Sequence, residues 1–276
     1  MQKFNIIYFL KSLKSIKNTS VITKKFFIKF FGKKNNSEFG TYLDFLKTNS
    51  IDFQLFSKLD PEIWLETQEI AKKINDEGKD VLNYIEYDLG GGGSVEVVYF
   101  LTRLIKPNNI IETGVAAGFT TYAFLKAIEK NKKGNLYSSD FPYFRLPNAE
   151  QFIGIIIPAS LKKKWNLYIN GDENNIKEIK KRIKSVDLVH YDSDKTYEGR
   201  KNFLKSISTI IHKDTFIIMD DLHDNTFFYD LISKDKNLNW KIVNIKKNNS
   251  IKSYDNSIKK TYIGIIYPDS FEDRLK

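Results

Sequence analysis

Three carboxylates follow two apolar stretches of the sequence and could together bind a divalent cation. Asp192 belongs to "HYDSDKTYEGR", which comes directly after the apolar run "VDLV", whereas Asp220 and Asp221 follow "TFIIM". If the two apolar stretches are neighbouring strands of a parallel sheet, all three carboxylates lie at one edge of that sheet. Carboxylates this close repel one another, and a bound cation removes the repulsion. All-oxygen ligation favours Mg²⁺ or Mn²⁺, or Ca²⁺, over Zn²⁺.

Lys195 stands three residues after Asp192, where it could act as a general base. A metal in this place would hold a substrate hydroxyl and lower its pKa, and Lys195 could then remove the proton. The cation should lower the pKa of Lys195, whereas the neighbouring carboxylates act in the opposite direction. A structural interpretation competes with this chemistry. Asp220 or Asp221 could cap the helix that follows, and Lys195 could belong to a solvated turn.

A glycine-containing turn, "ETGVAAGFTT" at residues 112–121, could bind a nucleoside cofactor. Gly114 and Gly118 allow a backbone to come close to a ligand, and the helix start beyond them favours a negative group. Ala116 stands where a dinucleotide fingerprint has its second glycine, which weakens the dinucleotide interpretation. Glu112 would suit an ammonium group such as that of S-adenosylmethionine. We expect cofactor contacts from Glu112, Gly114, Val115 and Gly118; the alternative is a tight strand-to-helix turn with a solvated glutamate.

Two further aspartates follow the next strands of the predicted sheet. Asp140, in "YSSDFP", could accept hydrogen bonds from both hydroxyls of a ribose, or could cap a helix. Asp172, in "NGDENN", could contact an adenine amine, or could cap the helix that begins near Asn174. Together with Asp192, they complete the predicted cofactor site.

The segments that must position these residues alternate between short apolar strands and helices after Pro107. This alternation is typical of a parallel sheet with helices on both faces. Two last strands, at 240–247 and 261–268, are joined by a polar segment and should pair antiparallel. Five parallel strands followed by a terminal antiparallel hairpin resemble the Rossmann-like α/β sheet of class I methyltransferases more than a dinucleotide dehydrogenase. The five parallel strands are predicted at 109–115, 135–140, 165–170, 186–192 and 214–221.

The sequence before this sheet divides into two parts. Residues 1–36 form a basic amphipathic arm, and residues 37–95 form a mostly helical extension or lid, with a glycine-rich hinge at 90–93. The four glycines could instead cradle a phosphate, but no Lys-Ser or Lys-Thr pair follows them. Residues 96–276 are the predicted S-adenosylmethionine-binding domain.

Charge and composition narrow the function classes. The net charge is +10, but residues 1–34 hold nine lysines and no acid, so the rest of the chain is nearly neutral. We therefore predict no nucleic-acid partner. The chain has no cysteine, which excludes thiolate chemistry and fits a reducing compartment.

The basic arm, residues 1–34, interleaves aromatic residues with lysines, as in "KKFFIKFFGKK". It could contact an anionic membrane, or it could pack on its own domain or on a second subunit of a homo-oligomer. No window approaches ~18 consecutive apolar residues, so nothing is predicted to span a membrane. We expect a cytoplasmic protein, with peripheral contact at the inner membrane face as a further possibility.

The motifs "ETGVAAGFTT", "YDSDKTYEG" and "MDD" resemble those of cation-dependent O-methyltransferases, and most of all methyltransferase family 24. The resemblance covers roughly residues 90–232. It implies that Asp192, Asp220 and Asp221 bind the metal and that Lys195 is the base. The family usually has histidine at the position of Lys195, which is a departure.

The predicted function is S-adenosylmethionine-dependent O-methyl transfer to a hydroxyl or diol of a small molecule, sugar or glycolipid, with Lys195 and Asp192 as catalytic residues. Two alternatives remain. Relatives close to cephalosporin hydroxylase imply a metal-dependent hydroxylase-like enzyme on the same fold. The basic arm allows a non-catalytic protein that binds a membrane surface.

Overall fold

The structure, a computed structural model, describes residues 36–143, 146–247 and 259–274. Of the basic arm predicted at residues 1–36, residues 1–35 lie outside the described residues. Of the predicted hairpin, both strands are described and the connection between them is not.

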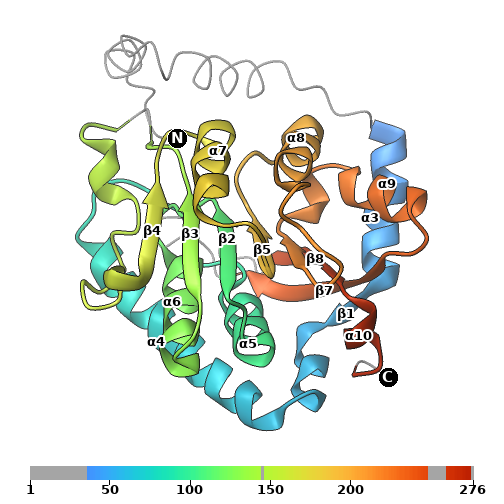
Figure 1. The fold of residues 1–276 in the computed structure, drawn as a ribbon, viewed down its shortest axis with the longest axis horizontal. Coiled ribbons are helices and arrows are strands. Elements are labelled where there is room, and N and C mark those ends of the chain that lie inside the picture. The colour runs from blue at the N-terminus through green and yellow to red at the C-terminus, as the bar shows by residue number, and fades with distance from the viewer. Residues whose placement is uncertain (1–35, 144–145, 248–258, 275–276) are drawn as a thin grey trace.

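The described part of the chain is built around an eight-stranded sheet (Figure 1). From one edge to the other, the strand order is β1-β7-β8-β6-β5-β2-β3-β4. The strands are β1 (Ser50–Asp52), β2 (Asn109–Thr113), β3 (Asn135–Ser139), β4 (Trp165–Tyr168), β5 (Leu188–Tyr191), β6 (Phe216–Met219), β7 (Asn239–Lys247) and β8 (Lys259–Tyr267).

Strand directions confirm the predicted Rossmann-like fold. The five strands from β2 to β6 pair in parallel, and β8 pairs antiparallel with both β6 and β7. Strands β5 and β6 are neighbours, with Tyr191 opposite Met219, so the loops that follow them meet at one edge. Strand β1 was not predicted; it pairs in parallel with β7 and extends the sheet.

Helices cover both faces of the sheet (Figure 1). One face packs against α4, α5 and α6, and the other against α3, α7, α8 and α9. Alternate strand residues supply the two layers: Ile110 belongs to the first and Ile111 to the second. The helices are α3 (Asn36–Asn49), η1 (Phe53–Lys58), α4 (Pro61–Asn83), α5 (Val95–Ile105), α6 (Phe119–Asn131), η2 (Ala149–Phe152), η3 (Lys162–Lys164), α7 (Asp172–Arg182), α8 (Tyr197–Ile207), η4 (Leu222–Asp224), α9 (Phe227–Lys234) and α10 (Asp269–Glu272).

The extension before the main sheet contains the long helix α4, in keeping with the predicted helical character of residues 37–95. Asp60 caps it by accepting a 2.9 Å hydrogen bond from the Ile63 backbone N–H, and Pro61 occupies the first turn. Helix α4 packs against α5 and α6, so the extension contributes to the same core.

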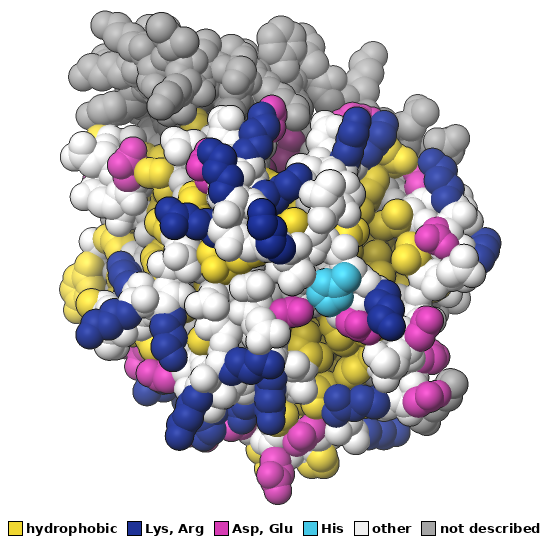
Figure 2. All heavy atoms as spheres, viewed as in Figure 1, with side chains coloured by type: hydrophobic (Ala, Val, Ile, Leu, Met, Phe, Trp, Pro, Cys, Tyr) yellow, Lys and Arg dark blue, Asp and Glu magenta, His cyan; other side chains and the backbone are white. Residues whose placement is uncertain are grey.

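The surface carries charges of both signs. On the face drawn in Figure 2, lysine and arginine side chains are scattered among acidic, apolar and other polar groups rather than gathered in one stripe. None of the helices in the described parts of the chain combines the length and the apolar character that crossing a membrane requires.

Candidate active site

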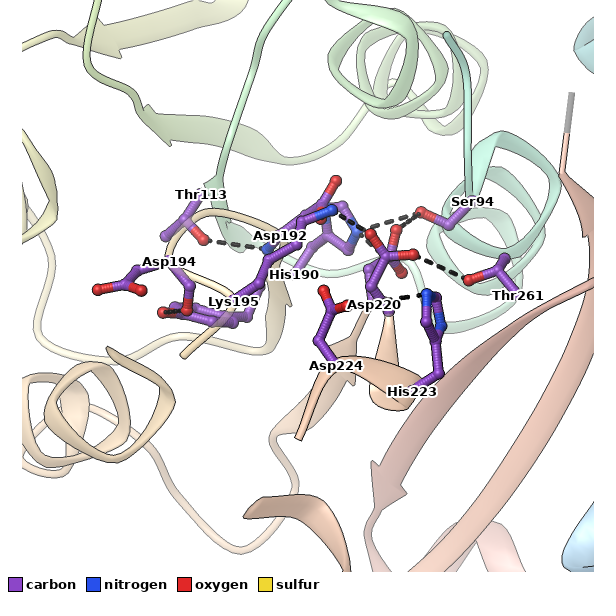
Figure 3. Close-up of polar contacts among 12 residues, drawn as sticks. Ser94, Thr113, His190, Asp192, Asp194, Lys195, Asp220, His223, Asp224 and Thr261 are labelled. Carbon is purple, nitrogen blue, oxygen red and sulfur yellow. Dashed lines mark hydrogen bonds and ion pairs between the residues drawn. The ribbon is translucent and has the colours of Figure 1, made fainter. Parts of the chain in front are cut away.

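The carboxylates after β5 and β6 lie side by side at the carboxyl edge of the sheet, as predicted (Figure 3). The Asp220 backbone N–H donates a 3.1 Å hydrogen bond to the Tyr191 carbonyl, which extends the pairing of the two strands to the site itself. Asp192, on the β5 side, is therefore held next to Asp220 and Asp221. The side chain of Asp194 points away from this group in Figure 3 and caps the next turn through Thr196.

Lys195 bridges two of the three carboxylates. Its Nζ lies 3.0 Å from Asp192 Oδ1 and also contacts Asp221 Oδ2. Burial disfavours the ammonium, but attraction to both carboxylates outweighs burial and raises the pKa of Lys195. The sequence predicts that a cation lowers the pKa of Lys195 and that the carboxylates raise it. In this structure the carboxylates raise the pKa, and Lys195 is an ammonium group.

Asp220 is held by two residues that sequence reasoning did not place in the site. The Ser94 hydroxyl donates a 2.7 Å hydrogen bond to Asp220 Oδ2, and His190 Nε2 lies 3.5 Å from Asp220 Oδ1. Ser94 Oγ is also 3.1 Å from His190 Nε2. Burial disfavours the imidazolium of His190, but attraction to Asp220 and to other nearby carboxylates raises its pKa.

Two carboxylate oxygens have an ion-pair neighbour but no well-directed hydrogen bond. Asp192 Oδ1 and Asp220 Oδ1 are buried and accept no well-directed hydrogen bond from any described residue. Burial, opposed by Lys195 and reinforced by the two neighbouring aspartates, raises the pKa of Asp192 from 3.8 to about 6. Such orphaned acceptors fit a hard cation, which carboxylate oxygens bind well.

The third predicted metal ligand is already engaged. Asp221 Oδ1 accepts a 2.9 Å hydrogen bond from Thr261, and its Oδ2 contacts Lys195. Within residues 36–143, 146–247 and 259–274, no three histidine, aspartate or glutamate side chains form a ready metal-binding group. A metal bound by all three aspartates therefore requires Lys195 to move aside, and it stays a prediction.

A buried arginine fixes the turn that carries the aspartate pair. Asp221 has φ 50° and ψ 49°, a left-handed conformation that side chains rarely adopt. The Arg200 guanidinium, 1% exposed, donates hydrogen bonds of 2.8 and 3.0 Å to the carbonyls of Asp220 and Asp221. Arg200 is the last residue of "HYDSDKTYEGR", and the sequence gives no signal for its role.

The glycine turn packs tightly against the rest of the protein. Gly114 (φ 83°) touches the backbone of Asp192 so closely that a Cβ would collide with the Asp192 carbonyl. At Gly118 (φ 104°), a Cβ would lie 2.8 Å from the Cα of Gly154. Val115 is buried, and its carbonyl accepts a 2.9 Å bond from Gly118 N–H. Gly114 thus joins the glycine turn to the carboxylate site, and Gly118 packs the turn against Gly154. The contact of these glycines with a cofactor stays a prediction.

Glu112 is fully buried beneath this turn. Its carboxylate accepts hydrogen bonds of 2.6–2.8 Å from the hydroxyls of Thr120, Thr121 and Ser138. Burial raises its pKa, and attraction to His190 and the three hydroxyls opposes that rise. Glu112 therefore ties the start of α6 to β3 in this structure, and its predicted contact with a cofactor ammonium is untested.

Asp140 and Asp172 both border the turn but differ in what they offer. Asp140 is half-buried, and its oxygens accept backbone hydrogen bonds from Ala116 (2.8 Å) and Phe141 (2.6 Å). Carboxylate oxygens have further lone pairs, so Asp140 fits the predicted ribose contact. Asp172 is the first residue of α7 rather than its cap, and its carboxylate accepts from Ser139 and Ser193. An adenine amine would have to compete with these two hydroxyls for the Asp172 carboxylate oxygens.

Comparison with known families finds one similarity, over the middle of the chain. Residues 111–222 match the model of methyltransferase family 24, described as a methyltransferase domain. The matched part includes the glycine turn and all three aspartates. This part of the chain is therefore similar in sequence to a methyltransferase domain. The comparison with curated protein sequences found no match.

Solved structures share this fold at low sequence identity. A Klebsiella pneumoniae protein described as an O-methyltransferase is 12% identical with a TM-score of 0.51, covering 72% of this chain and 89% of that one. The O-methyltransferase TomG of Streptomyces achromogenes, involved in tomaymycin synthesis and solved with S-adenosylmethionine, is 11% identical with a TM-score of 0.50 and the same coverage. These likenesses show the fold.

Proposed function

We propose that this chain is an S-adenosylmethionine-dependent O-methyltransferase that uses a divalent cation and acts on a hydroxyl or diol of a small molecule, sugar or glycolipid. The observation that carries the proposal is the contact of Gly114 with the Asp192 backbone. Because of this contact, the predicted cofactor turn lies directly beside the predicted metal ligand Asp192. The similarity of residues 111–222 to a methyltransferase domain and the O-methyltransferases that share the fold support the proposal.

The residues around the glycine turn would hold the cofactor. Asp140 would accept hydrogen bonds from the ribose, and Gly114, Val115 and Gly118 would line the turn. When bound, S-adenosylmethionine supplies an electrophilic methyl group, to which a hydroxyl oxygen bonds as the carbon–sulfur bond breaks. The protein must hold that hydroxyl in line and receive its proton.

Asp192 and Asp220 would hold the cation through their buried Oδ1 atoms, which accept no well-directed hydrogen bond from the described residues, with Asp221 as the third ligand. When bound, Mg²⁺ or Mn²⁺ supplies a Lewis acid that lowers the pKa of a coordinated hydroxyl. Ser94 and His190 keep the Asp220 carboxylate in place, so the cation would meet a preset oxygen.

Two groups could receive the proton. Lys195 carries a proton while it bridges Asp192 and Asp221. It becomes a base only when the bound metal ion, in place of the ammonium, compensates the charge of those carboxylates. Asp192, whose pKa is raised to about 6 when no cation is bound, is the other candidate only in the metal-free protein, because a bound cation would occupy its carboxylate. We propose Lys195 as the base, because its Nζ contacts two of the three carboxylates and its side chain is 39% exposed.

The test is a methyl-transfer assay on the full chain with methyl-labelled S-adenosylmethionine and a panel of catechols, sugars with vicinal diols, and glycolipids. Label should enter one or more acceptors with Mg²⁺ and fall sharply with a chelator. Asp140→Asn should reduce transfer through weaker cofactor binding. Oxygen consumption with iron, in the absence of label transfer, would instead favour a hydroxylase.

We further propose that residues 1–34 bring the protein to an anionic membrane from the cytoplasm, since this segment concentrates nine lysines among aromatic residues. Deleting it should abolish binding to anionic liposomes and leave cofactor binding intact. Liposome binding that survives the deletion would contradict this role, and a change in oligomeric state would favour packing on a second subunit.

A further inference from the structure

A cavity of about 530 Å³ opens beside the carboxylate cluster, between η1, α4, the start of α5 and β7. Asp52 and Gln68 are exposed at its rim, Trp64 and Glu96 are half-buried in its walls, and Phe53 is buried below them. Its size is within the range of small-molecule sites.

Two contacts connect this cavity to the carboxylates. Gly93 lines the cavity, and a Cβ on it would lie 3.6 Å from Asp220 Oδ2, so no side chain separates the two. Ile245, which also lines the cavity, is opposite Thr261 in the β7–β8 pair, and Thr261 donates the hydrogen bond to Asp221. A ligand in the cavity therefore borders the predicted methyl-transfer site.

The charge that the described residues give to the lining is negative. Asp52 and Glu96 are the charged residues in the described lining, which includes no lysine, arginine or histidine. Burial, and then repulsion by Asp52, raises the pKa of Glu96. The Glu96 carboxylate makes no hydrogen bond or ion pair with a described residue. Such a wall attracts a cationic group and repels phosphate or carboxylate.

The remaining lining suits a polyhydroxylated ligand. The side-chain amides of Gln68 and Asn75 make no hydrogen bond with the described protein, so their donors and acceptors are free for hydroxyls. The ring of Trp64 lies in the wall, with its centroid 5.5 Å from that of Phe53. An aromatic wall can pack against the C–H face of a sugar ring and favours a nearby ammonium.

We propose that this cavity binds the methyl acceptor and that the acceptor is a polyhydroxylated amine of the amino-sugar class, with its ammonium against Glu96 and Asp52. The inference rests on the proposed function, because it takes the ligand next to Asp220 to be the acceptor. Bound there, the amine neutralises the two carboxylates and leaves ring hydroxyls to face Gly93 and the aspartates beyond it.

The test is calorimetric binding to the full chain without cofactor, using D-glucosamine, N-acetyl-D-glucosamine and D-glucose 6-phosphate as probes. Glucosamine should bind about tenfold more tightly than its neutral N-acetyl form, because only glucosamine carries an ammonium that Glu96 and Asp52 can attract. Glucose 6-phosphate should not bind. Glu96→Gln should weaken glucosamine binding about tenfold, and Asp52→Asn, which keeps a capping side chain for η1, should weaken it less.

Glu69→Gln is the matched control, because Glu69 is an exposed α4 residue outside the cavity and the substitution changes the charge equally. Its glucosamine binding should equal that of the wild type.

Equal affinity for the neutral and charged sugars, no binding of any probe, or binding that does not change in the Glu96 and Asp52 variants would overturn the inference. A parallel titration with S-adenosylhomocysteine separates the two claims. Glucosamine binding without nucleoside binding would refute the proposed methyl transfer. It would leave standing the claim that the cavity binds an amino sugar.

Discussion

Ser94 donates a 2.7 Å hydrogen bond to the carboxylate of Asp220, although 126 residues separate them. Ser94 directly follows the glycine-rich segment at residues 90–93 and precedes the first residue of α5. The bond therefore fixes the end of the predicted hinge to the carboxyl edge of the sheet, beside the proposed cation site. It also satisfies Asp220 Oδ2, whereas Asp220 Oδ1 faces His190 Nε2 at 3.5 Å and accepts no well-directed hydrogen bond from the described residues.

Replacing Ser94 with alanine should destabilise the protein and weaken cation binding. The substitution removes the donor to Asp220 Oδ2 and leaves a buried carboxylate oxygen without a partner, which costs about 1–3 kcal/mol of the free energy of unfolding. Urea denaturation without divalent cation measures this cost. Ser208→Ala, which removes an exposed hydroxyl from the end of α8, should be nearly neutral. Equal stability of the two variants would refute the importance of the Ser94 contact.

Replacing Lys195 with methionine should make stability more dependent on magnesium. Without the ammonium, Asp192 and Asp221 are left facing each other uncompensated, and the free energy of unfolding should fall by about 1–3 kcal/mol, a value reduced for the partial exposure of Lys195. A bound cation replaces the lost charge, so Mg²⁺ should stabilise this variant more than the wild type in thermal unfolding. The same gain in both proteins would argue against a cation site at these carboxylates.

Asp192 should make the metal-free protein less stable as the pH rises from about 4 to about 7. Its pKa is raised from 3.8 to about 6, so the folded state holds this proton more tightly than the unfolded state does. The resulting stabilisation is fully present below about pH 4 and is lost as the pH rises through about 6. The free energy of unfolding of the wild type, minus that of Asp192→Asn, should fall by about 1–3 kcal/mol as the pH rises over this range. Chemical denaturation at several pH values, with a chelator present, gives that difference. A difference that stays constant or grows with pH would contradict the raised pKa.

Replacing Gly118 with alanine should destabilise the glycine turn. Gly118 has φ 104°, and a Cβ would lie 2.8 Å from the Gly154 Cα, so both backbone strain and a clash oppose a side chain. We expect a loss of about 1–3 kcal/mol in the free energy of unfolding. Gly40→Ala in α3, where no atom lies within 4 Å of the added Cβ, should be neutral or stabilising. If both variants unfold alike, the close packing of the turn has been misjudged.

The sheet could be predicted from the sequence because its central strands are buried on both faces and stand out as short apolar runs. The neighbouring positions of β5 and β6 followed from the same pattern, and they brought Asp192 to Asp220 and Asp221. Strand β1 could not be predicted, since its three residues become a strand only by pairing with β7, almost 200 residues later. Its local sequence lies between helical stretches and carries no strand pattern of its own.

The partners of the carboxylates could not be read from the sequence for a related reason. Ser94 reaches Asp220 through the packing of α5 against the sheet, and His190 reaches it through the pairing of β5 with β6. The sequence does not signal either contact. The position of Lys195 was predicted, but its charge state depends on distances to Asp192 and Asp221 that spacing does not supply. The inward-facing bonds of Glu112 to three hydroxyls likewise depend on how α6 and β3 meet.

Thermal unfolding of the full chain, titrated with S-adenosylhomocysteine and S-adenosylmethionine with and without Mg²⁺, tests the central claim most directly. A nucleoside that binds only the folded state must raise the melting temperature with concentration. We predict such a rise for both nucleosides. It should be lost in Asp140→Asn and kept in Asp235→Asn, which removes an exposed carboxylate far along the chain. No shift with either nucleoside in the wild type, at any concentration and with or without Mg²⁺, would contradict the account.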